Sequence, residues 1–237
     1  MSGWAKRRFW TEVAVAQADD GFTIALDGRP VRTPARAPLA VPTRALADRI
    51  ATEWRAQEQM IDPGAMPATR AANAAIDKVR GQHAEVAAMI AAYGDADLIC
   101  YRAKAPEGLV AAEAAAWDPL VDWAAARFEA RLTVCAGVIH HPQPPEALHA
   151  LRAPVTAMSA FELTALHDLV SLTGSLVIGL AAAEDRDTPG ALWAASRIEE
   201  EWQIAQWGED AEARTMTEAR RRAFLEAKAF LDALRLP

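Results

Sequence analysis

The hydrophobic pattern of this chain changes once, and that change limits the fold more than any other feature. Between residues 9 and 42 apolar and polar side chains alternate, as in Phe22, Ile24 and Leu26. A period of two is typical of β-strands that bury one face. From residue 43 onward the apolar residues recur every three or four positions, the period of an amphipathic helix. Strands followed by helices predict an α+β fold rather than a doubly wound sheet.

Turn-forming residues set the limits of the expected elements. Asp27-Gly28 predicts a tight hairpin, because both central residues of a type I′ turn need positive φ. Pro30 lacks a backbone donor, so the returning strand is expected at an edge of the sheet. We therefore expect a small β-rich domain over residues 1–60 and a larger helical domain over residues 61–237.

Three helices are expected from periodicity and from capping residues. One apolar stripe predicts a continuous helix over residues 72–90. Asp118-Pro119 is expected to begin a second helix, with Asp as the cap and Pro in the first turn. Thr188-Pro189 is expected to open a third helix that ends at Gly208. The uncharged stretch over residues 169–183 predicts a buried helix pair.

Charge and composition exclude several classes of function. The 237 residues include 25 basic and 32 acidic side chains, so nucleic acid is not an expected partner. The longest uncharged stretch has 15 residues, whereas a membrane-spanning helix needs about 20. The N-terminus is basic without a following apolar run, so no signal peptide is expected and the protein is predicted to be cytoplasmic. Cys100 and Cys135 lie in apolar strings without metal-binding spacing and are expected to be buried thiols.

The charge is distributed unevenly along the chain. Residues 1–80 contain 12 basic and 9 acidic side chains, and the remaining residues contain 13 and 23. This difference has two interpretations. Either the charge composition varies between the segments without functional meaning, or the two lobes have different contact surfaces.

One segment has the composition of a protein-contact surface. Glu199, Glu200 and Glu201 are consecutive, so on a helix they diverge and do not form a catalytic carboxylate pair. Helical spacing places Glu200, Gln203 and Trp207 on one face, and Ile198 and Trp202 on another. Exposed tryptophan beside carboxylate and amide groups is typical of interface hot spots. We predict a partner-binding site formed by Glu199, Glu200, Glu201, Trp202, Gln203 and Trp207.

A second polar row is formed by Arg70, Asn73 and Asp77, which share one helix face. This row either binds a partner or clamps the β-rich lobe to the helical lobe through arginine hydrogen bonds. Nearby Trp54 is assigned to the core.

The sequence also contains residues that suggest an enzymatic alternative. His167-Asp168, with His140 and His141 upstream and acidic residues downstream, is compatible with a metal-dependent phosphohydrolase. The spacing is loose, and two of the histidines lie beside a proline-rich loop. No nucleophile elbow, phosphate-binding loop, dinucleotide fingerprint or zinc-protease motif is present. We therefore expect no enzyme activity, no cofactor and no metal.

Three phrases in collinear order carry a resemblance to a known family. They are Asp27 to Pro34, Ile61 to Arg70, and Ser196 to Gly208. Together they resemble the assembly chaperones that bind the alpha subunit of the F-type ATP synthase, the ATP-twelve chaperone family. The resemblance extends from about Phe9 to Gly208.

The resemblance implies a β-rich N-terminal domain and a helical C-terminal domain. It also implies binding to an unassembled alpha subunit and shielding of the surface that the beta subunit later covers, without catalysis. An acidic residue of the helical domain is important in the family and is assigned here to Glu200, with Glu199 and Glu201 as near alternatives. The mitochondrial members carry a transit peptide, which this chain is expected to lack, so a bacterial form is expected. The protein is also expected to be a monomer. A passive scaffold for another complex remains an alternative.

Overall fold

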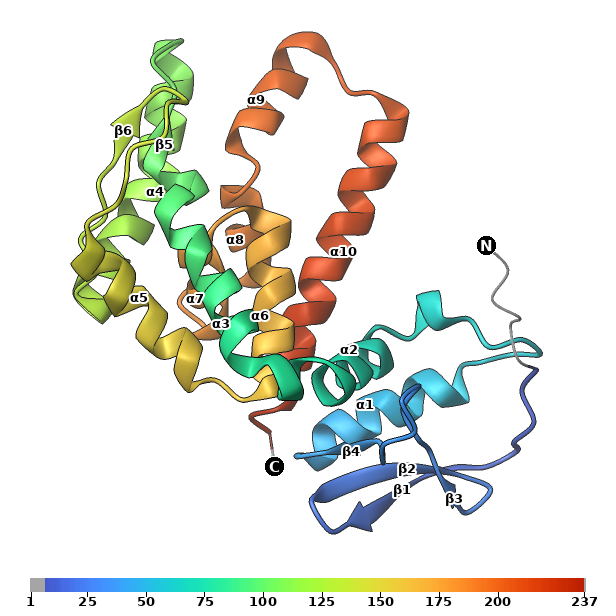
Figure 1. The fold of residues 1–237 in the computed structure, drawn as a ribbon. Helices are drawn as coiled ribbons and strands as arrows, with labels where there is room; N and C mark the ends of the chain where they lie inside the picture. Colours follow the sequence, from blue (N-terminus) through green and yellow to red (C-terminus); the bar gives the residue numbers. More distant parts are fainter. Residues whose placement is uncertain (1–6, 237) are drawn as a thin grey trace. The chain divides into compact units, whose positions relative to one another are not determined.

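The computed structural model describes residues 7–236 and divides into two compact units (Figure 1). The first unit comprises the chain up to His83, Ser159–Ala165, and the segment from Ala229. The second unit comprises Ala84–Met158 and Leu166–Lys228. The first six residues, on which part of the signal-peptide expectation rests, lie outside the described residues. The boundary at residue 60 remains a prediction.

A small antiparallel sheet opens the first unit. Its strands are β1 (Val13–Ala18), β2 (Gly21–Leu26), β3 (Arg29–Pro30) and β4 (Ala40–Val41), and both β3 and β4 pair with β2. The predicted hairpin is confirmed, since Asp27 and Gly28 have φ values of 48° and 77°. Strand β3 ends at Pro30, and beyond it the N–H of Thr33 donates to the carbonyl of Ala37 within the following loop.

Helix α1 (Arg44–Arg55) covers this sheet with the face that its period predicts. Leu46 and Ile50 are fully buried together with Ile24 of β2. Thr43 caps the helix, because its hydroxyl accepts the N–H of Leu46 at 3.3 Å. The transition from strands to helices therefore begins where the hydrophobic pattern changes.

The expectation of one continuous helix over residues 72–90 is wrong. The segment forms η1 (Pro63–Ala65), α2 (Pro67–Asp77), η2 (Val79–Gln82), α3 (His83–Ala91) and η3 (Ala92–Ala96). The helix breaks at Lys78, whose φ and ψ are −125° and −63°. An apolar stripe specifies which face is buried but not whether the axis continues, and Gly81 favours a break because glycine is a poor helix former.

The second unit consists mainly of helices, two of which also extend into the first unit. These are α4 (Glu107–Phe128), α5 (Pro145–Ala157), α6 (Ala160–Thr173), α7 (Leu176–Ala183), α8 (Pro189–Ala195), α9 (Ile198–Trp207) and α10 (Ala211–Ala233). A short η4 (Leu98–Cys100) leads into β5 (Tyr101–Arg102), which pairs in parallel with β6 (Cys135–Ala136). With the N-terminal strands, this confirms the α+β prediction.

One expected helix start and one expected helix length differ from the structure, whereas the expected start at Thr188-Pro189 is confirmed by the Thr188 cap of α8. Asp118-Pro119 lies inside α4, which begins at Glu107. A proline removes only one backbone donor, and the flanking turns of a 22-residue helix hold the segment helical. The helix expected from Thr188 to Gly208 is interrupted after Ala195 and resumes as α9.

Helix α7 forms the centre of the second unit, and all eight of its residues are buried. With the end of α6 it makes the buried pair predicted for residues 169–183. Across residues 7–236, no helix combines the length and apolarity needed to cross a membrane. Cys100 is fully buried, which raises the pKa of its thiol to about 12, whereas Cys135 is partly exposed and both thiols are free.

Candidate partner-binding site

The interruption between α8 and α9 places a buried cation beneath the candidate site. Arg197 is 7% exposed, and its guanidinium contacts the carboxylate of Glu200. It also donates to the hydroxyl of Thr217 at 3.2 Å and lies 5.9 Å from the ring of Trp193. Arg197 therefore holds Glu200 in place, while about half of the Glu200 side chain remains exposed. Sequence reasoning did not single out Arg197, because it expected one unbroken helix.

Helix α9 presents the predicted polar and aromatic face to solvent. None of its residues is buried, and Glu200, Gln203 and Trp207 are all exposed. Trp207 is 80% exposed, an unusual state for so large an apolar side chain. Glu201 is also exposed. The structure thus brings together the residues that the helical spacing places on one face.

The opposite face of α9 is held against α4 by Trp202. This side chain is half-buried and lies over Gly108, where a Cβ atom would come within 2.6 Å of Trp202 Cη2. Glycine therefore provides the space that the indole occupies. The two tryptophans have different roles, since Trp202 docks the helix and Trp207 projects from it.

A buried carboxyl group that the sequence analysis missed lies beside Glu199. Glu113 of α4 is fully buried, and its Oε2 accepts the N–H of Ala103 at 2.8 Å. Burial raises the pKa of Glu113, and the neighbouring Glu199 carboxyl raises it further. The only sequence signal was a single glutamate within the alanine-rich start of α4.

The second polar row lies on α2 in the first unit. Asp77 accepts the N–H of Ala35 through Oδ2 at 3.0 Å and so fixes the loop before β4 to this helix. Asn73 is half-buried, whereas Arg70 is exposed and makes no ion pair within residues 7–236. Trp54 is half-buried rather than fully buried, and it packs against the buried Trp10 with ring centroids 5.0 Å apart. A clamp between lobes through Arg70 remains a prediction.

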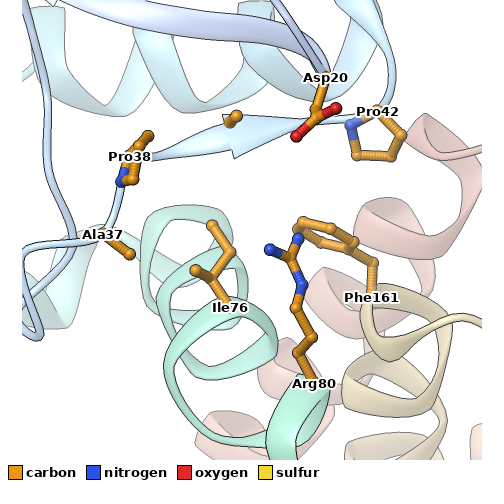
Figure 2. Close-up of a pocket in the computed structure, with 8 residues that line it drawn as sticks. Asp20, Ala37, Pro38, Pro42, Ile76, Arg80 and Phe161 are labelled. Carbon is orange, nitrogen blue, oxygen red and sulfur yellow. The ribbon is translucent and has the colours of Figure 1, made fainter.

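The first unit also contains a small polar cavity of about 280 Å³ (Figure 2). Figure 2 shows the Arg80 guanidinium beside the Phe161 ring and directed toward the wall that carries Asp20 and Pro42. Small-molecule sites usually have volumes of about 300–1,000 Å³ and mostly apolar walls. The size and polarity of this cavity therefore do not favour a cofactor site.

The histidines of the enzymatic alternative do not converge. His167 Nδ1 lies 3.0 Å from Asp168 Oδ1, and this contact raises the pKa of His167. His140 instead contacts Tyr101 and Asp95. In the described part of the chain, no group of three His, Cys, Asp or Glu side chains is arranged to hold a metal ion.

Comparison with known proteins agrees with this architecture. The model of a family described as ATP12 chaperone protein matches residues 7–125. Atp12 from Paracoccus denitrificans, known from a crystal structure, is 49% identical with a TM-score of 0.93, covering 97% of this chain and 98% of that chain. A crystal structure of an Agrobacterium tumefaciens protein is 41% identical with a TM-score of 0.92, covering 96% and 86%.

A more distant relative is the mitochondrial protein atp12 of Schizosaccharomyces pombe. It is 24% identical over 214 residues, covering 85% of this chain and 74% of that protein. The family model spans half of the chain, and the Paracoccus structure matches nearly all of it. These matches establish that the chain belongs to the ATP12 chaperone family.

Proposed function

We propose that this protein is an assembly chaperone that binds the unassembled alpha subunit of the F-type ATP synthase. It shields the surface of that subunit that the beta subunit later covers, in the cytoplasm of a bacterial cell. The motifs quoted above imply this client, and the chaperone family supports the general role. The protein acts as a monomer and performs no catalytic step.

The observation that carries the proposal is the exposed face of α9. Trp207 is 80% exposed beside Gln203 and the Arg197-supported Glu200. An aromatic side chain rimmed by polar groups can bury apolar client surface and remain compatible with water when the client is absent. An assembly chaperone must release its client, and micromolar binding, about −8 kcal/mol, is sufficient for this purpose.

The phosphohydrolase alternative has less support. His167 and Asp168 contact one another on a partly exposed helix surface, and His140 contacts Asp95 and Tyr101 instead. Their side chains do not surround a common point at which a metal could activate water.

Binding of purified alpha subunit to the wild type and to two α9 variants tests the proposal. Trp207→Ala removes an exposed anchor, and Glu200→Lys reverses the charge above Arg197. We expect each variant to bind at least about tenfold more weakly, since hot-spot truncations cost 2 kcal/mol or more. Titration calorimetry measures the affinity, and aggregation of the alpha subunit during dilution from denaturant measures protection.

Glu146→Lys is the matched control, because Glu146 is an exposed acid in the first turn of α5. It should bind like the wild type. If the wild type neither binds the alpha subunit nor suppresses its aggregation, the proposed function is wrong. If Trp207→Ala and Glu200→Lys bind like the control, the function stands and the site lies elsewhere.

A further inference from the structure

Strand β1 forms one edge of the sheet in the first unit. Within residues 7–236 its only strand partner is β2, whereas β2 also pairs with β3 and β4 (Figure 1). A strand with a neighbour on one side only leaves half of its backbone N–H and C=O groups without a partner in the ladder. The direction of these groups decides whether the edge can bind another chain.

The register of the β1–β2 pair shows which backbone groups face outward. The carbonyl of Glu12 accepts the N–H of Asp27 at 3.1 Å, so this carbonyl points toward β2. In an antiparallel ladder the direction alternates from one residue to the next. The N–H and C=O groups of Val13, Val15 and Gln17 therefore point away from β2, toward the free edge.

One of these outward groups is already occupied. The guanidinium of Arg55 donates to the carbonyl of Val13 at 3.1 Å, which agrees with a carbonyl directed away from β2. In the described part of the chain, no hydrogen bond reaches the outward groups of Val15 and Gln17. Val15 is partly exposed and Gln17 is exposed. Two donors and two acceptors therefore remain open, at the two-residue spacing of an extended strand.

The two edges of this sheet differ in how they are protected. Natural sheets protect their edges with short strands, charged residues, proline or bulges. Strand β3 follows this rule, since it consists only of Arg29 and Pro30. Strand β1 has six residues, none of which is charged or proline, and residues 13–18 pair one-to-one with β2 without a bulge. The edge of β1 is therefore an unprotected template for strand pairing.

An edge of this kind recognises backbone rather than a particular side chain. An extended segment adds itself as a further strand, and its main-chain hydrogen bonds provide the affinity. Every polypeptide carries the complementary groups, so the partner has to be extended but needs no special charge. Val15 and Ala16 lie on opposite faces of the sheet and are both partly exposed, so both can contact side chains of the added strand.

We propose that the edge of β1 binds an extended segment of the unassembled client as an added strand, hydrogen-bonded to Val15 and Gln17. This inference rests on the proposed function, because the client is taken to be the alpha subunit. A second copy of this chain is the competing occupant. Two edges six residues long would bury far less than the roughly 1,200 Å² of a stable dimer, whereas a small contact suits a client that must be released.

The first test changes one backbone group at the edge. Gln17→Pro removes the outward N–H and places a ring there, and prolines of this kind are tolerated on edge strands. Gln17→Ala is the matched control, because it shortens the same side chain and keeps the N–H. We expect Gln17→Pro to bind purified alpha subunit about three- to tenfold more weakly, the loss of one hydrogen bond, and Gln17→Ala to bind like the wild type.

A second variant keeps the backbone intact. Gln17→Lys adds a charge at an exposed position, the device by which natural edge strands resist pairing. We expect an unchanged urea midpoint and weaker binding of the alpha subunit. This variant carries the test if proline at residue 17 lowers the stability of the free protein.

Amide hydrogen exchange at single-residue resolution locates the contact. In the free protein we expect the amides of Val15 and Gln17 to exchange faster than those of Ala14 and Ala16, whose N–H groups face β2. Addition of purified alpha subunit should slow exchange at Val15 and Gln17 by about tenfold or more.

Three outcomes overturn the inference. If Gln17→Pro and Gln17→Lys bind the alpha subunit as the wild type does and exchange at Val15 and Gln17 does not slow, the edge is not used, although the proposed function stands. If light scattering shows a wild-type dimer that Gln17→Pro loses, the occupant is a second copy. If the wild type does not bind the alpha subunit, the proposed function fails and this inference fails with it.

Discussion

Glu53 shows how one side chain can join two helices of the first unit. It belongs to α1, yet its carboxylate accepts the N–H groups of Ala68 and Thr69 at 2.7 and 2.8 Å, and the Thr69 hydroxyl at 2.7 Å. Met66, at the N-cap position of α2, supplies no side-chain bond. Glu53 therefore caps α2 from a neighbouring helix and places a negative charge where the helix dipole favours it.

We predict that Glu53→Ala destabilises the protein by about 2–3 kcal/mol, because two buried N–H groups lose their acceptor. Urea unfolding measures the change. Glu58→Ala is the matched control, since Glu58 is exposed in the turn that follows α1. Equal stability of the two variants would show that water replaces the Glu53 cap without cost.

At the scale of elements, the position of α9 depends on the small side chain beneath it. Gly108→Ala would place a Cβ atom 2.6 Å from Trp202 Cη2, and a rigid indole cannot absorb that overlap without moving. We expect a loss of about 1–3 kcal/mol from overpacking, which exceeds the roughly 1 kcal/mol that alanine gains in helix propensity. Hydrogen exchange over residues 198–207 should accelerate.

Gly190→Ala is the matched control for Gly108→Ala. Gly190 lies in the first turn of α8, and a Cβ atom there meets nothing within 4 Å. This variant should be as stable as the wild type or slightly more stable. Unchanged exchange of α9 in Gly108→Ala would mean that Trp202 does not hold the helix.

For the whole molecule, Asp97 makes stability depend on pH. It is fully buried, and its two carboxylate oxygens accept the N–H groups of Val177 at 3.0 Å and Ile99 at 3.3 Å. Burial raises the pKa of Asp97 from 3.8 to about 6, although hydrogen bonds from Ser175 and the backbone oppose the shift. Asp97 thereby links two segments about 80 residues apart in the chain.

The raised pKa of Asp97 determines whether stability rises or falls with pH. Between pH 4 and pH 6 the folded state holds a proton on Asp97 that the unfolded chain releases, so stability falls as pH rises through this window. The contribution is up to about 3 kcal/mol. We expect wild type to lose more stability than Asp97→Asn between pH 4 and pH 6.5 in urea titrations. Asp122→Asn, an exposed control, should follow the wild type, and parallel curves for all three proteins would contradict the assignment.

Patterns within the sequence determined the local features of this protein. The hairpin at Asp27-Gly28, the cap at Thr43 and the solvent-facing row of Glu200 and Trp207 all follow from side chains that act on residues a few positions away. Hydrophobic period sets which face is buried, and turn chemistry sets where a strand reverses. These short-range effects also predicted the α+β class.

The tertiary structure decided the features that depend on distant residues. Three contacts join segments that are distant in sequence: Arg197 with Thr217, Glu113 with Glu199, and Trp202 with Gly108. Intrinsic helix propensity is a weak signal. It does not determine where a helix breaks, because the packing of the whole unit overrides it. The buried charges beneath the candidate site, Arg197 and Glu113, therefore became visible only when α4, α9 and α10 were seen together.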